Sequence, residues 1–396
     1  MGSEWPIAEL KELCTKIGSG ATPRGGSNVY LDRGEISLIR SQNIYNDRFT
    51  PDGLVFISQA AAKQLDNVTV APEDVLLNIT GDSVARCCLV DPKVLPARVN
   101  QHVAIIRTDP NKLNPQYLRY YLVSPSMQSQ MLSWAQAGAT RNALTKGMIE
   151  SFEIPVPPLS VQRRIASILG SLDDKIELNR RMNQTLEKMA AALFKSWFID
   201  FDPVHAKAQG DPTAGGLPSH IANLFPDSFE ESELGPIPKG WKAKPLIEVI
   251  EVNPRRTLSK GTPAPFLEMS SMPTQGPSPD TWRIREMGSG MKFINGDTLM
   301  ARITPCLENG KTAFVDFLAE GEVGWGSTEF IVLRPNGEIP PLFAYLLART
   351  DEFRSFAIRQ MMGSSGRQRV PAESLSKYML ITPEENSPVF HALGPV

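Results

Sequence analysis

Histidine and cysteine are the residue types in this chain that could bind a metal or act in catalysis. There are four of each, namely His102, His205, His220, His391, Cys14, Cys87, Cys88 and Cys306. No two cysteines have the C-x-x-C spacing of a zinc or redox site, and the histidines lie far apart in the sequence. We therefore predict no metal site and no cofactor, and the cysteine pattern indicates a reducing compartment.

Two other patterns resemble catalytic motifs but lack the context that such motifs need. The Gly-Ser-Gly segment at 18–20 is a fragment of a dinucleotide fingerprint without the strand and helix that should flank it, so it predicts a turn. Pro-Asp pairs at 51–52, 226–227 and 279–280 lie among glycine and proline, which favours turns over nuclease carboxylates. The sequence has no phosphate-binding P-loop, and we predict no catalytic residue.

The charge of the chain is unevenly distributed. Its formal net charge is only -2, but residues 199–236 hold seven acidic residues against one lysine. The rest of the chain therefore carries an excess of about four positive charges. Such an excess is too small for indiscriminate binding of a polyanion, and it suits a protein that binds nucleic acid together with partners.

The length and hydropathy of the chain predict a soluble, cytoplasmic protein with more than one domain. Its 396 residues, 41% of them hydrophobic, suffice for two compact domains and a connecting element. No apolar run approaches the roughly 20 residues needed to cross a membrane, and the start of the chain does not resemble a signal peptide.

An internal repeat supports the two-domain organisation. Four segment pairs match at a separation of about 226 residues: 103–107 with 330–334, 120–122 with 345–347, 140–142 with 366–368, and 152–157 with 378–383. Within each repeat, short β-branched runs such as 74–79 and 329–333 predict strands, and 114–132 and 341–361 have the apolar spacing of helices. The pattern predicts two mixed α/β domains, which by itself indicates only a duplicated globular fold.

A long helix is predicted between the repeats, over residues 160–198. Its seam has alternating spacings of four and three, at Ile165, Leu169, Leu172, Ile176, Asn179, Asn183, Leu186, Ala190, Leu193 and Trp197. At about 1.5 Å per residue the helix should be roughly 55 to 60 Å long, which predicts a spacer. Asn179 and Asn183 interrupt the seam, either to meet polar partners that fix register or because the middle of the helix is exposed.

The repeat offset places the start of a second such helix near Pro383, close to the end of the sequence. We therefore expect this second helix to be truncated relative to the first. The apolar seam of the first helix should then be exposed, pair with another copy, or be covered by another protein.

Several segments resemble a known family. The stretch PPLSVQRRIASILGSLDDKIELNRRMNQTLEKMAAALFKSWFIDFDPV at 157–204 is similar to the central helix of type I restriction-modification specificity subunits. The segment SELGPIPKGW at 232–241 resembles the lead-in to that family's second target recognition domain. The segments GSGATP at 18–23 and GATRNALTKGMIESFEIPVPPL at 138–159 are also similar to the family, so the resemblance covers essentially the whole chain.

The resemblance implies an α+β architecture in which two target recognition domains are joined by a long coiled-coil-type helix. The expected parts are a first recognition domain at 1–157, a spacer helix at 158–200, an acidic Gly/Pro-rich linker at 201–240, a second recognition domain at 241–383, and the start of the second helix at 384–396. Each domain would read one half of a bipartite target in double-stranded DNA. The helix would set the gap and dock methylation subunits, and restriction subunits would join the assembled complex. Methyl transfer and cleavage would belong to these partners, so the chain itself would not be an enzyme.

Residue type and loop setting give candidate DNA contacts, because arginine can bind guanine, asparagine and glutamine can bind adenine, and small hydroxyls suit phosphate. In the first domain they are Thr22, Arg24, Arg40, Ser41, Asn43, Thr140, Arg141 and Asn142. In the second they are Arg255, Arg256, Lys260, Ser364, Ser365, Arg367, Gln368 and Arg369. The residues expected to bind partner subunits are Ile165, Leu169, Leu172, Ile176, Asn179, Asn183, Leu186, Leu193 and Trp197.

Two alternatives to this function remain. One is an enzyme whose recognition half is all that the sequence shows, which the lack of cofactor or carboxylate motifs disfavours. The other is a non-catalytic scaffold that bridges proteins through its helix and carries degenerate recognition domains. The small excess of positive charge outside residues 199–236 is compatible with such a scaffold.

Overall fold

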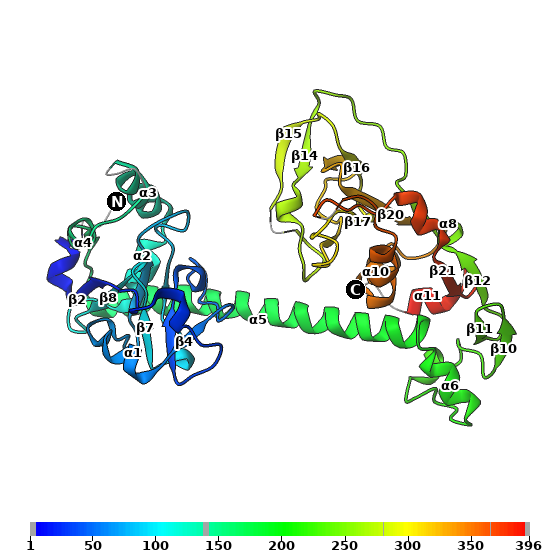
Figure 1. Ribbon diagram of the computed structural model, residues 1–396, viewed down its shortest axis with the longest axis horizontal. Helices are drawn as coiled ribbons and strands as arrows, with labels where there is room; N and C mark the ends of the chain where they lie inside the picture. The colour runs from blue at the N-terminus through cyan, green and yellow to red at the C-terminus, as the bar shows by residue number, and fades with distance from the viewer. Residues whose placement is uncertain (1–4, 138–141, 280, 365, 393–396) are drawn as a thin grey trace. The chain divides into compact units, whose positions relative to one another are not determined.

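The computed structural model describes residues 5–137, 142–279, 281–364 and 366–392 and divides into two compact units. Unit 1 comprises residues 1–178 and unit 2 residues 179–396. Helix α5, Leu159–Phe198, is 40 residues long and contributes one part to each unit (Figure 1). Its bounds agree with the helix predicted from the heptad seam. Within the described ranges, no helix is both long enough and apolar enough to span a membrane.

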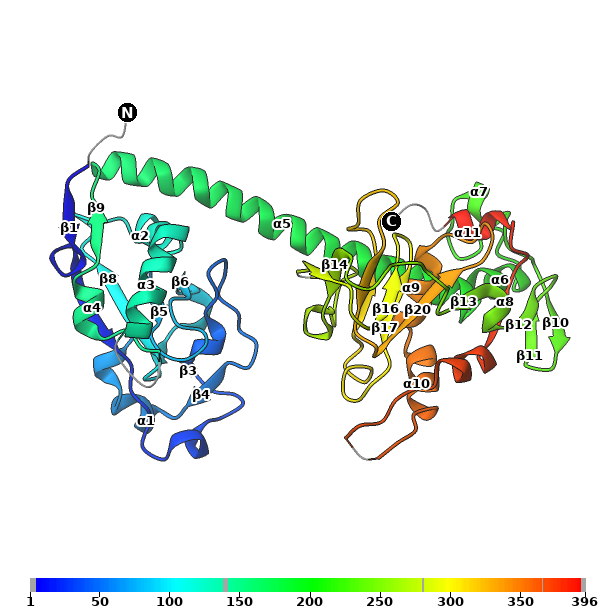
Figure 2. The same ribbon diagram turned by 90° about the horizontal axis from the view of Figure 1, so that it is seen from above.

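The described residues of unit 1 form nine strands, arranged in sheets of four, three and two. The four-stranded sheet has the order β2-β8-β5-β6 and comprises Cys14–Ser19, Val103–Thr108, Val75–Asn78 and Cys87–Leu89. The three-stranded sheet has the order β4-β3-β7 and comprises Val55–Ile57, Ile36–Ile39 and Ala97–Val99. Strands β1 (Ile7–Glu9) and β9 (Glu153–Pro155) form an antiparallel pair (Figure 2). The helices are α1 Gln59–Lys63, α2 Pro115–Leu122, α3 Pro125–Ala137 and α4 Lys146–Glu150.

The alternation of side chains along β5 explains the layering of unit 1. Successive residues of a strand point to opposite faces of its sheet. Val75 and Leu77 pack into a core with α2 and α3, whereas Leu76 packs into a second core beneath the three-stranded sheet. Strand β5 is therefore buried on both faces, between a layer of helices and a second sheet, which explains its uninterrupted apolar run.

Twelve strands lie in the part of unit 2 that the structure describes. One four-stranded sheet has the order β13-β20-β17-β18 and comprises Ile250–Val252, Phe330–Pro335, Thr298–Ala301 and Thr312–Phe314. The other has the order β15-β14-β19-β16 and comprises Arg283–Glu286, Pro263–Leu267, Gly324–Gly326 and Met291–Phe293. The two-stranded pairs are β12 Lys242–Pro245 with β21 Met379–Thr382, and β10 Phe229–Ser232 with β11 Gly235–Pro238. The helices are α6 Asp202–Ala208, α7 Ser219–Ala222, α8 Leu246–Val249, α9 Leu342–Arg349, α10 Asp351–Arg359 and α11 Pro388–Ala392.

The strand pairing of unit 2 repeats that of unit 1. The order β13-β20-β17-β18 corresponds to β2-β8-β5-β6, and the pair β12-β21 corresponds to β1-β9. A parallel pairing also matches between the units, since β3 pairs with β7 and β14 with β19. The duplication of mixed α/β domains predicted from the sequence repeat is thus present in the structure.

Each predicted helix at 114–132 and 341–361 is in fact a pair of helices. In unit 1, α2 ends at Leu122 and α3 begins at Pro125, because the proline fits the first turn of a new helix but not the interior of an old one. In unit 2, Thr350 separates α9 from α10 and its side chain caps the second helix by accepting a hydrogen bond from the amide of Phe353.

The segment predicted as an acidic linker is folded. Besides α6, α7 and the β10-β11 hairpin, it supplies buried side chains to the core of unit 2, including Phe201, Val204 and Phe225. The ring of Phe225 lies edge-on to Trp197, with ring centroids 5.2 Å apart. Most acidic residues of this segment, Asp202, Asp227, Glu230, Glu231 and Glu233, are exposed, which is why composition alone suggested a linker.

Candidate nucleic-acid interface

Three segments that are distant in sequence meet at the end of β5 in unit 1. The amide of Ile79 donates to the carbonyl of His102 (2.9 Å), and the amide of Leu144 donates to the carbonyl of Ile79 (2.8 Å). The amide of Gly81 donates to the carbonyl of Asn142 (3.2 Å). We call residues 79–81, 101–102 and 142–144 the loop edge of unit 1.

Polar side chains of the loop edge form a connected group. Thr80 Oγ1 and His102 Nδ1 lie 2.6 Å apart, and the amide nitrogen of Gln101 lies 2.9 Å from the other ring nitrogen of His102. The hydroxyl of Thr22 donates to the side-chain oxygen of Gln101. The group offers hydroxyl, amide and imidazole groups, the types that bind phosphates and base edges.

Gly20 allows Thr22 to reach this group. Its amide donates to the carbonyl of Val103 (2.9 Å), and a Cβ at position 20 would lie 2.1 Å from the carbonyl oxygen of Asn100. A side chain is therefore excluded at this position. Gly18 and Ser19 lie within β2, so the turn predicted at 18–20 is wrong, and the segment is the end of a strand held close to its neighbour.

Unit 2 has the same three backbone hydrogen bonds at the corresponding place. The amide of Arg302 donates to the carbonyl of Glu329 (3.0 Å), and the amide of Val370 donates to the carbonyl of Arg302 (2.9 Å). The amide of Thr304 donates to the carbonyl of Gln368 (3.0 Å). We call residues 302–304, 328–329 and 368–370 the loop edge of unit 2.

The two loop edges also share an antiparallel bridge. Thr80 pairs with Ala143 in unit 1, and Ile303 pairs with Arg369 in unit 2. The side chains differ although the backbone pattern is the same. In unit 2, Arg369 Nε lies 2.8 and 2.9 Å from the two carboxylate oxygens of Glu329, and Arg302 Nε lies 3.9 Å from the same carboxylate.

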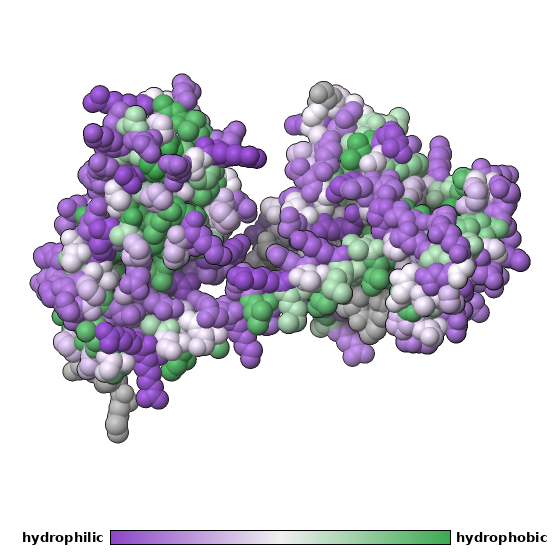
Figure 3. Space-filling model, turned by 90° about the horizontal axis from the view of Figure 1, so that it is seen from below, coloured by the Kyte–Doolittle hydropathy of each residue, from purple (hydrophilic) through white to green (hydrophobic). Residues whose placement is uncertain are grey.

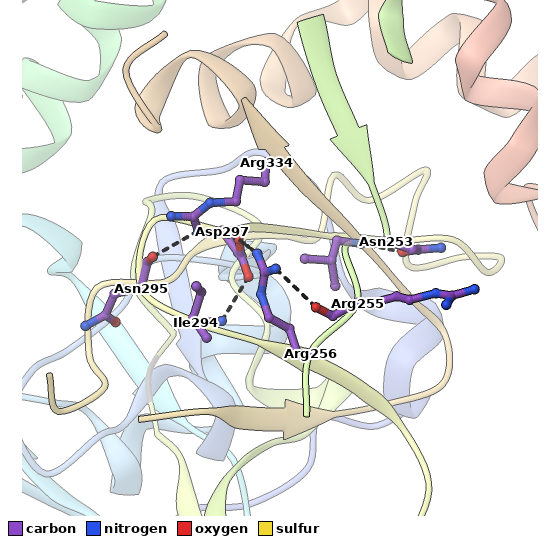
Figure 4. Close-up of polar contacts among 8 residues, drawn as sticks. Asn253, Arg255, Arg256, Ile294, Asn295, Asp297 and Arg334 are labelled. Atoms are coloured by element: carbon purple, nitrogen blue, oxygen red, sulfur yellow. Dashed lines mark hydrogen bonds and ion pairs between the residues drawn. The ribbon is translucent and has the colours of Figure 1, made fainter. Parts of the chain in front are cut away.

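A buried ion pair supports the same strands in both units. In unit 1, Arg107 of β8 binds Asp74, just before β5, through two bonds of 2.8 Å, and Asp74 is fully buried. In unit 2, Arg334 of β20 binds the buried Asp297 at 2.6 Å, and Arg256 lies 3.3 Å from the same oxygen (Figure 4). A buried carboxylate requires such partners.

Arg256 was predicted to contact DNA, and the structure corrects this. Its guanidinium is held by Asp297 and by the carbonyl of Arg255, and only 17% of its side chain is exposed. Arg255 is exposed, and in Figure 4 its side chain extends away from Asp297. Lys260 is also exposed. Only Arg255 and Lys260 of these three remain candidate contacts.

Asn43 is a second correction, because its side chain is fully buried. It donates to the carbonyls of Thr50 (3.0 Å) and Asp52 (3.1 Å) and accepts from the amide of Arg40 (3.0 Å). Its hydrogen-bonding capacity is used to hold the loop that follows β3. It therefore has no amide left for a base.

The other predicted residues of unit 1 differ in exposure. Thr22, Arg24 and Asn142 are exposed. Arg40 is half-buried and donates to the carbonyl of Gly53 (2.5 Å). Ser41 is half-buried, and its carbonyl accepts from the side chain of Asn78 at the end of β5 (2.8 Å). Thr140 and Arg141 lie outside the described residues.

In unit 2, the predicted residues after α10 form part of the loop edge or flank it. Ser364 and Arg367 are exposed, whereas Gln368 and Arg369 are half-buried. Ser365 lies outside the described residues. Glu329 and Arg302 were not predicted from the sequence, and neither were Thr80, Gln101 and His102 in unit 1. Each of them lies within two residues of the end of a strand that the two units share, and this position could have indicated them.

The candidate partner-binding surface lies along α5. Its exposed predicted residues are Leu172, Ile176, Asn179, Asn183, Leu186 and Leu193. Further exposed apolar residues that the seam missed are Ile168, Leu178, Met182 and Met189. Figure 3 shows hydrophobic side chains among hydrophilic ones along this helix. We call the apolar members of both sets the helix stripe.

The helix stripe leaves out four apolar seam residues, Ile165, Leu169, Ala190 and Trp197, of which Ala190 is buried in the core of unit 2. Trp197 is only 3% exposed and lies in the core of unit 2, so its predicted role in partner binding is wrong. Ile165 packs against the core of unit 1, and Leu169 is half-buried. The predicted seam therefore combined residues that pack against the units with residues of the exposed stripe, and it missed the neighbouring Ile168, Leu178, Met182 and Met189.

Comparison with known proteins shows what this chain is similar to. Residues 2–188 match the type I restriction modification DNA specificity domain. The chain is 29% identical over 318 residues to the HindI specificity subunit of Haemophilus influenzae, covering 69% of this chain and 67% of that protein. It is 26% identical over 266 residues to the MjaIX specificity subunit of Methanocaldococcus jannaschii, covering 63% of this chain and 52% of that protein.

A solved structure of the type I restriction-modification system S subunit from M. genitalium is similar over 98% of this chain and 89% of that one, with 14% identity and a TM-score of 0.49. The domain match and these relatives share one class, that of type I restriction enzyme specificity subunits. This chain is similar to these subunits, and the match to the DNA specificity domain covers residues 2–188.

Proposed function

We propose that this chain reads a bipartite DNA sequence, with each unit reading one half. The observation that carries this proposal is the pair of loop edges, which share backbone hydrogen bonds but present different side chains. A repeated reader of two unlike half-sites needs this combination, since the backbone positions the contacts and the side chains select the bases.

The side chains of the two loop edges favour different contacts. Unit 1 presents Thr80, Gln101 and His102. The hydroxyl and the amide each offer donors and acceptors, and each ring nitrogen of the imidazole donates or accepts depending on the tautomer. Unit 2 presents Arg302 and Arg369 around Glu329. The two half-sites should therefore differ in sequence.

We further propose that α5 sets the gap between the half-sites and docks methylation subunits through the helix stripe. Exposed apolar side chains repeated along one helix are suited to cover by a partner protein. Restriction subunits would join through the assembled complex, and all catalysis would belong to these partners.

Selection from a randomised DNA duplex library tests the proposal. The chain is purified together with its methylation subunit, and the library is bound at a stated salt concentration, because phosphate contacts make affinity depend on salt. We expect enrichment of two short sequences at a fixed spacing. Insertion of seven residues into the exposed part of α5 should change the spacing and leave both half-sites intact.

A helical scaffold with degenerate recognition domains is the second candidate. The positive excess of only about four charges outside residues 199–236 favours it. This scaffold would bind the methylation subunit but enrich no sequence from the library. That result would reject the DNA-reading proposal.

A further inference from the structure

The loop edge of unit 2 contains an arginine whose orientation is fixed by a carboxylate. Arg369 Nε lies 2.8 and 2.9 Å from the oxygens of Glu329, and Arg369 Nη2 lies 2.8 Å from one of them. Glu329 is itself held by its backbone, since its amide donates to the Ser327 hydroxyl and its carbonyl accepts from the amide of Arg302. The guanidinium is thus held through one of its edges.

The remaining donors of Arg369 are available. A guanidinium has five N–H bonds, and the contacts with Glu329 use the Nε side. Nη1 donates to the carbonyl of Arg367 at 3.3 Å. This leaves one N–H on each terminal nitrogen, at the end of a side chain that is 40% exposed. Donors on two adjacent terminal nitrogens can pair with O6 and N7 of guanine in the major groove.

We propose that Arg369 reads a guanine in the half-site of unit 2, and that Glu329 is the residue that positions it. This inference rests on the proposed function and adds the base class and the residue that reads it. The arginine loses less conformational freedom on binding because Glu329 already fixes its orientation.

Comparison with unit 1 argues against a purely structural ion pair. The counterpart of Arg369 at the shared bridge is Ala143, and the counterpart of Glu329 is His102. Unit 1 nevertheless has the same three backbone hydrogen bonds. The fold of the loop edge therefore does not need the ion pair, and the pair differs between the units as a specificity determinant should.

The local charge also suits an approaching duplex. Arg302 lies 3.9 Å from the carboxylate that Arg369 binds, so two arginines surround one glutamate. The cluster keeps one net positive charge, which offsets the repulsion between the Glu329 carboxylate and DNA phosphates.

The test is duplex selection with the chain in complex with its methylation subunit, in the wild type and in Arg369→Lys and Glu329→Gln. We expect a guanine at one position of one half-site in the wild type. Arg369→Lys keeps the charge but loses the paired donors, so preference for that guanine should fall about 10-fold or more while the other half-site is unchanged. Thermal unfolding of each variant shows whether unit 2 is still folded.

Glu329→Gln separates positioning from structure. Removal of the negative charge should raise affinity for unrelated DNA, while the guanine preference falls because the arginine is no longer held. Arg367→Gln, a neighbouring change of charge, should weaken binding to all sequences about equally.

Three outcomes would overturn the inference. The guanine could persist in Arg369→Lys, the loss could be equal for all sequences as for a phosphate contact, or the wild-type half-site could contain no guanine. A wild-type complex that enriches no sequence at all would instead reject the proposed function, so the two failures are distinguishable.

Discussion

The hydroxyl of Tyr345 in α9 donates a hydrogen bond of 2.6 Å to Glu187 of α5. Unit 1 has the corresponding contact, since Tyr120 of α2 donates to Asp173 of α5 at 2.8 Å. Each unit thus binds its own part of the long helix through a tyrosine from the same place in the repeat. Burial raises the pKa of the Tyr345 phenol, so it remains a donor where an exposed tyrosine would ionise.

Tyr345→Phe should lower the free energy of unfolding of unit 2 by about 1–2 kcal/mol, because a carboxylate loses its hydroxyl donor in a partly buried place. Tyr121→Phe is the matched control, since that hydroxyl donates to a backbone carbonyl at an exposed position. The control should cost less than about 1 kcal/mol. Urea unfolding measures both, and equal losses would contradict the prediction.

Replacement of the buried carboxylates should be more severe. Asp74→Asn and Asp297→Asn leave Arg107 and Arg334 without their charged partner, and we expect losses of about 3–5 kcal/mol in each case. Glu150→Gln removes the acid of a more exposed pair with Lys146, with 3.4 Å between charged atoms, and should cost less than about 1 kcal/mol. Urea unfolding measures the three variants. If the midpoints of Asp74→Asn and Asp297→Asn are no lower than that of Glu150→Gln, the buried ion pairs do not stabilise the units as predicted.

The thiols should differ in reactivity. Burial raises the pKa of Cys14 and of Cys88 to about 12 each and also raises the pKa of Cys87. Iodoacetamide at pH 8 should therefore modify the half-buried Cys306 first in the native protein, as followed by mass spectrometry. Cys14, Cys87 and Cys88 ionise more readily in the unfolded chain than in the folded protein. The free energy of unfolding should therefore fall as pH rises above about 9. Rapid native labelling of Cys87 would be inconsistent with its burial.

The helix stripe makes a prediction about assembly. Leu172→Asp combined with Leu186→Asp places two charges on exposed apolar positions and should abolish binding of the methylation subunit, as measured by copurification. Both units should remain folded, because neither leucine lies in a core cluster. Ser171→Asp with Gln184→Asp adds the same charge at exposed polar positions and should leave the complex intact. If the leucine variant still copurifies, the stripe is not the docking surface.

The loop edge of unit 1 can be tested independently of unit 2. His102→Ala removes the ring that contacts both Thr80 and Gln101, so base preference should change in one half-site only. Duplex selection in the complex measures this, with recovery of the unaltered second half-site as the internal control. A change in both half-sites would argue against separate readers.

Much of the fold was predictable from the sequence because the duplication leaves matched apolar strands and helices at a nearly constant offset. The limits of α5 also followed, since a heptad pattern is local. The burial of Trp197 could not be predicted, because helical periodicity shows which residues share a face but not whether a neighbouring core covers that face.

The candidate site was less predictable because polar residues were judged by type. Asn43 and Arg256 have the chemistry of DNA contacts, yet contacts with distant backbone and with Asp297 use that chemistry inside the fold. The partnership of Glu329 with Arg369 joins residues 40 positions apart, and only the pairing of the strands brings them together.

The backbone closure of the loop edges bears on how such a protein changes over generations. Main-chain hydrogen bonds close each edge, so a substitution at position 80, 102, 303 or 369 alters the exposed chemistry without removing a bond that holds the edge together. A substitution in the loop edge of one unit also leaves the loop edge of the other unit unchanged. If the chain reads DNA as proposed, a lineage can therefore acquire a new target one half at a time, and each intermediate remains a folded protein.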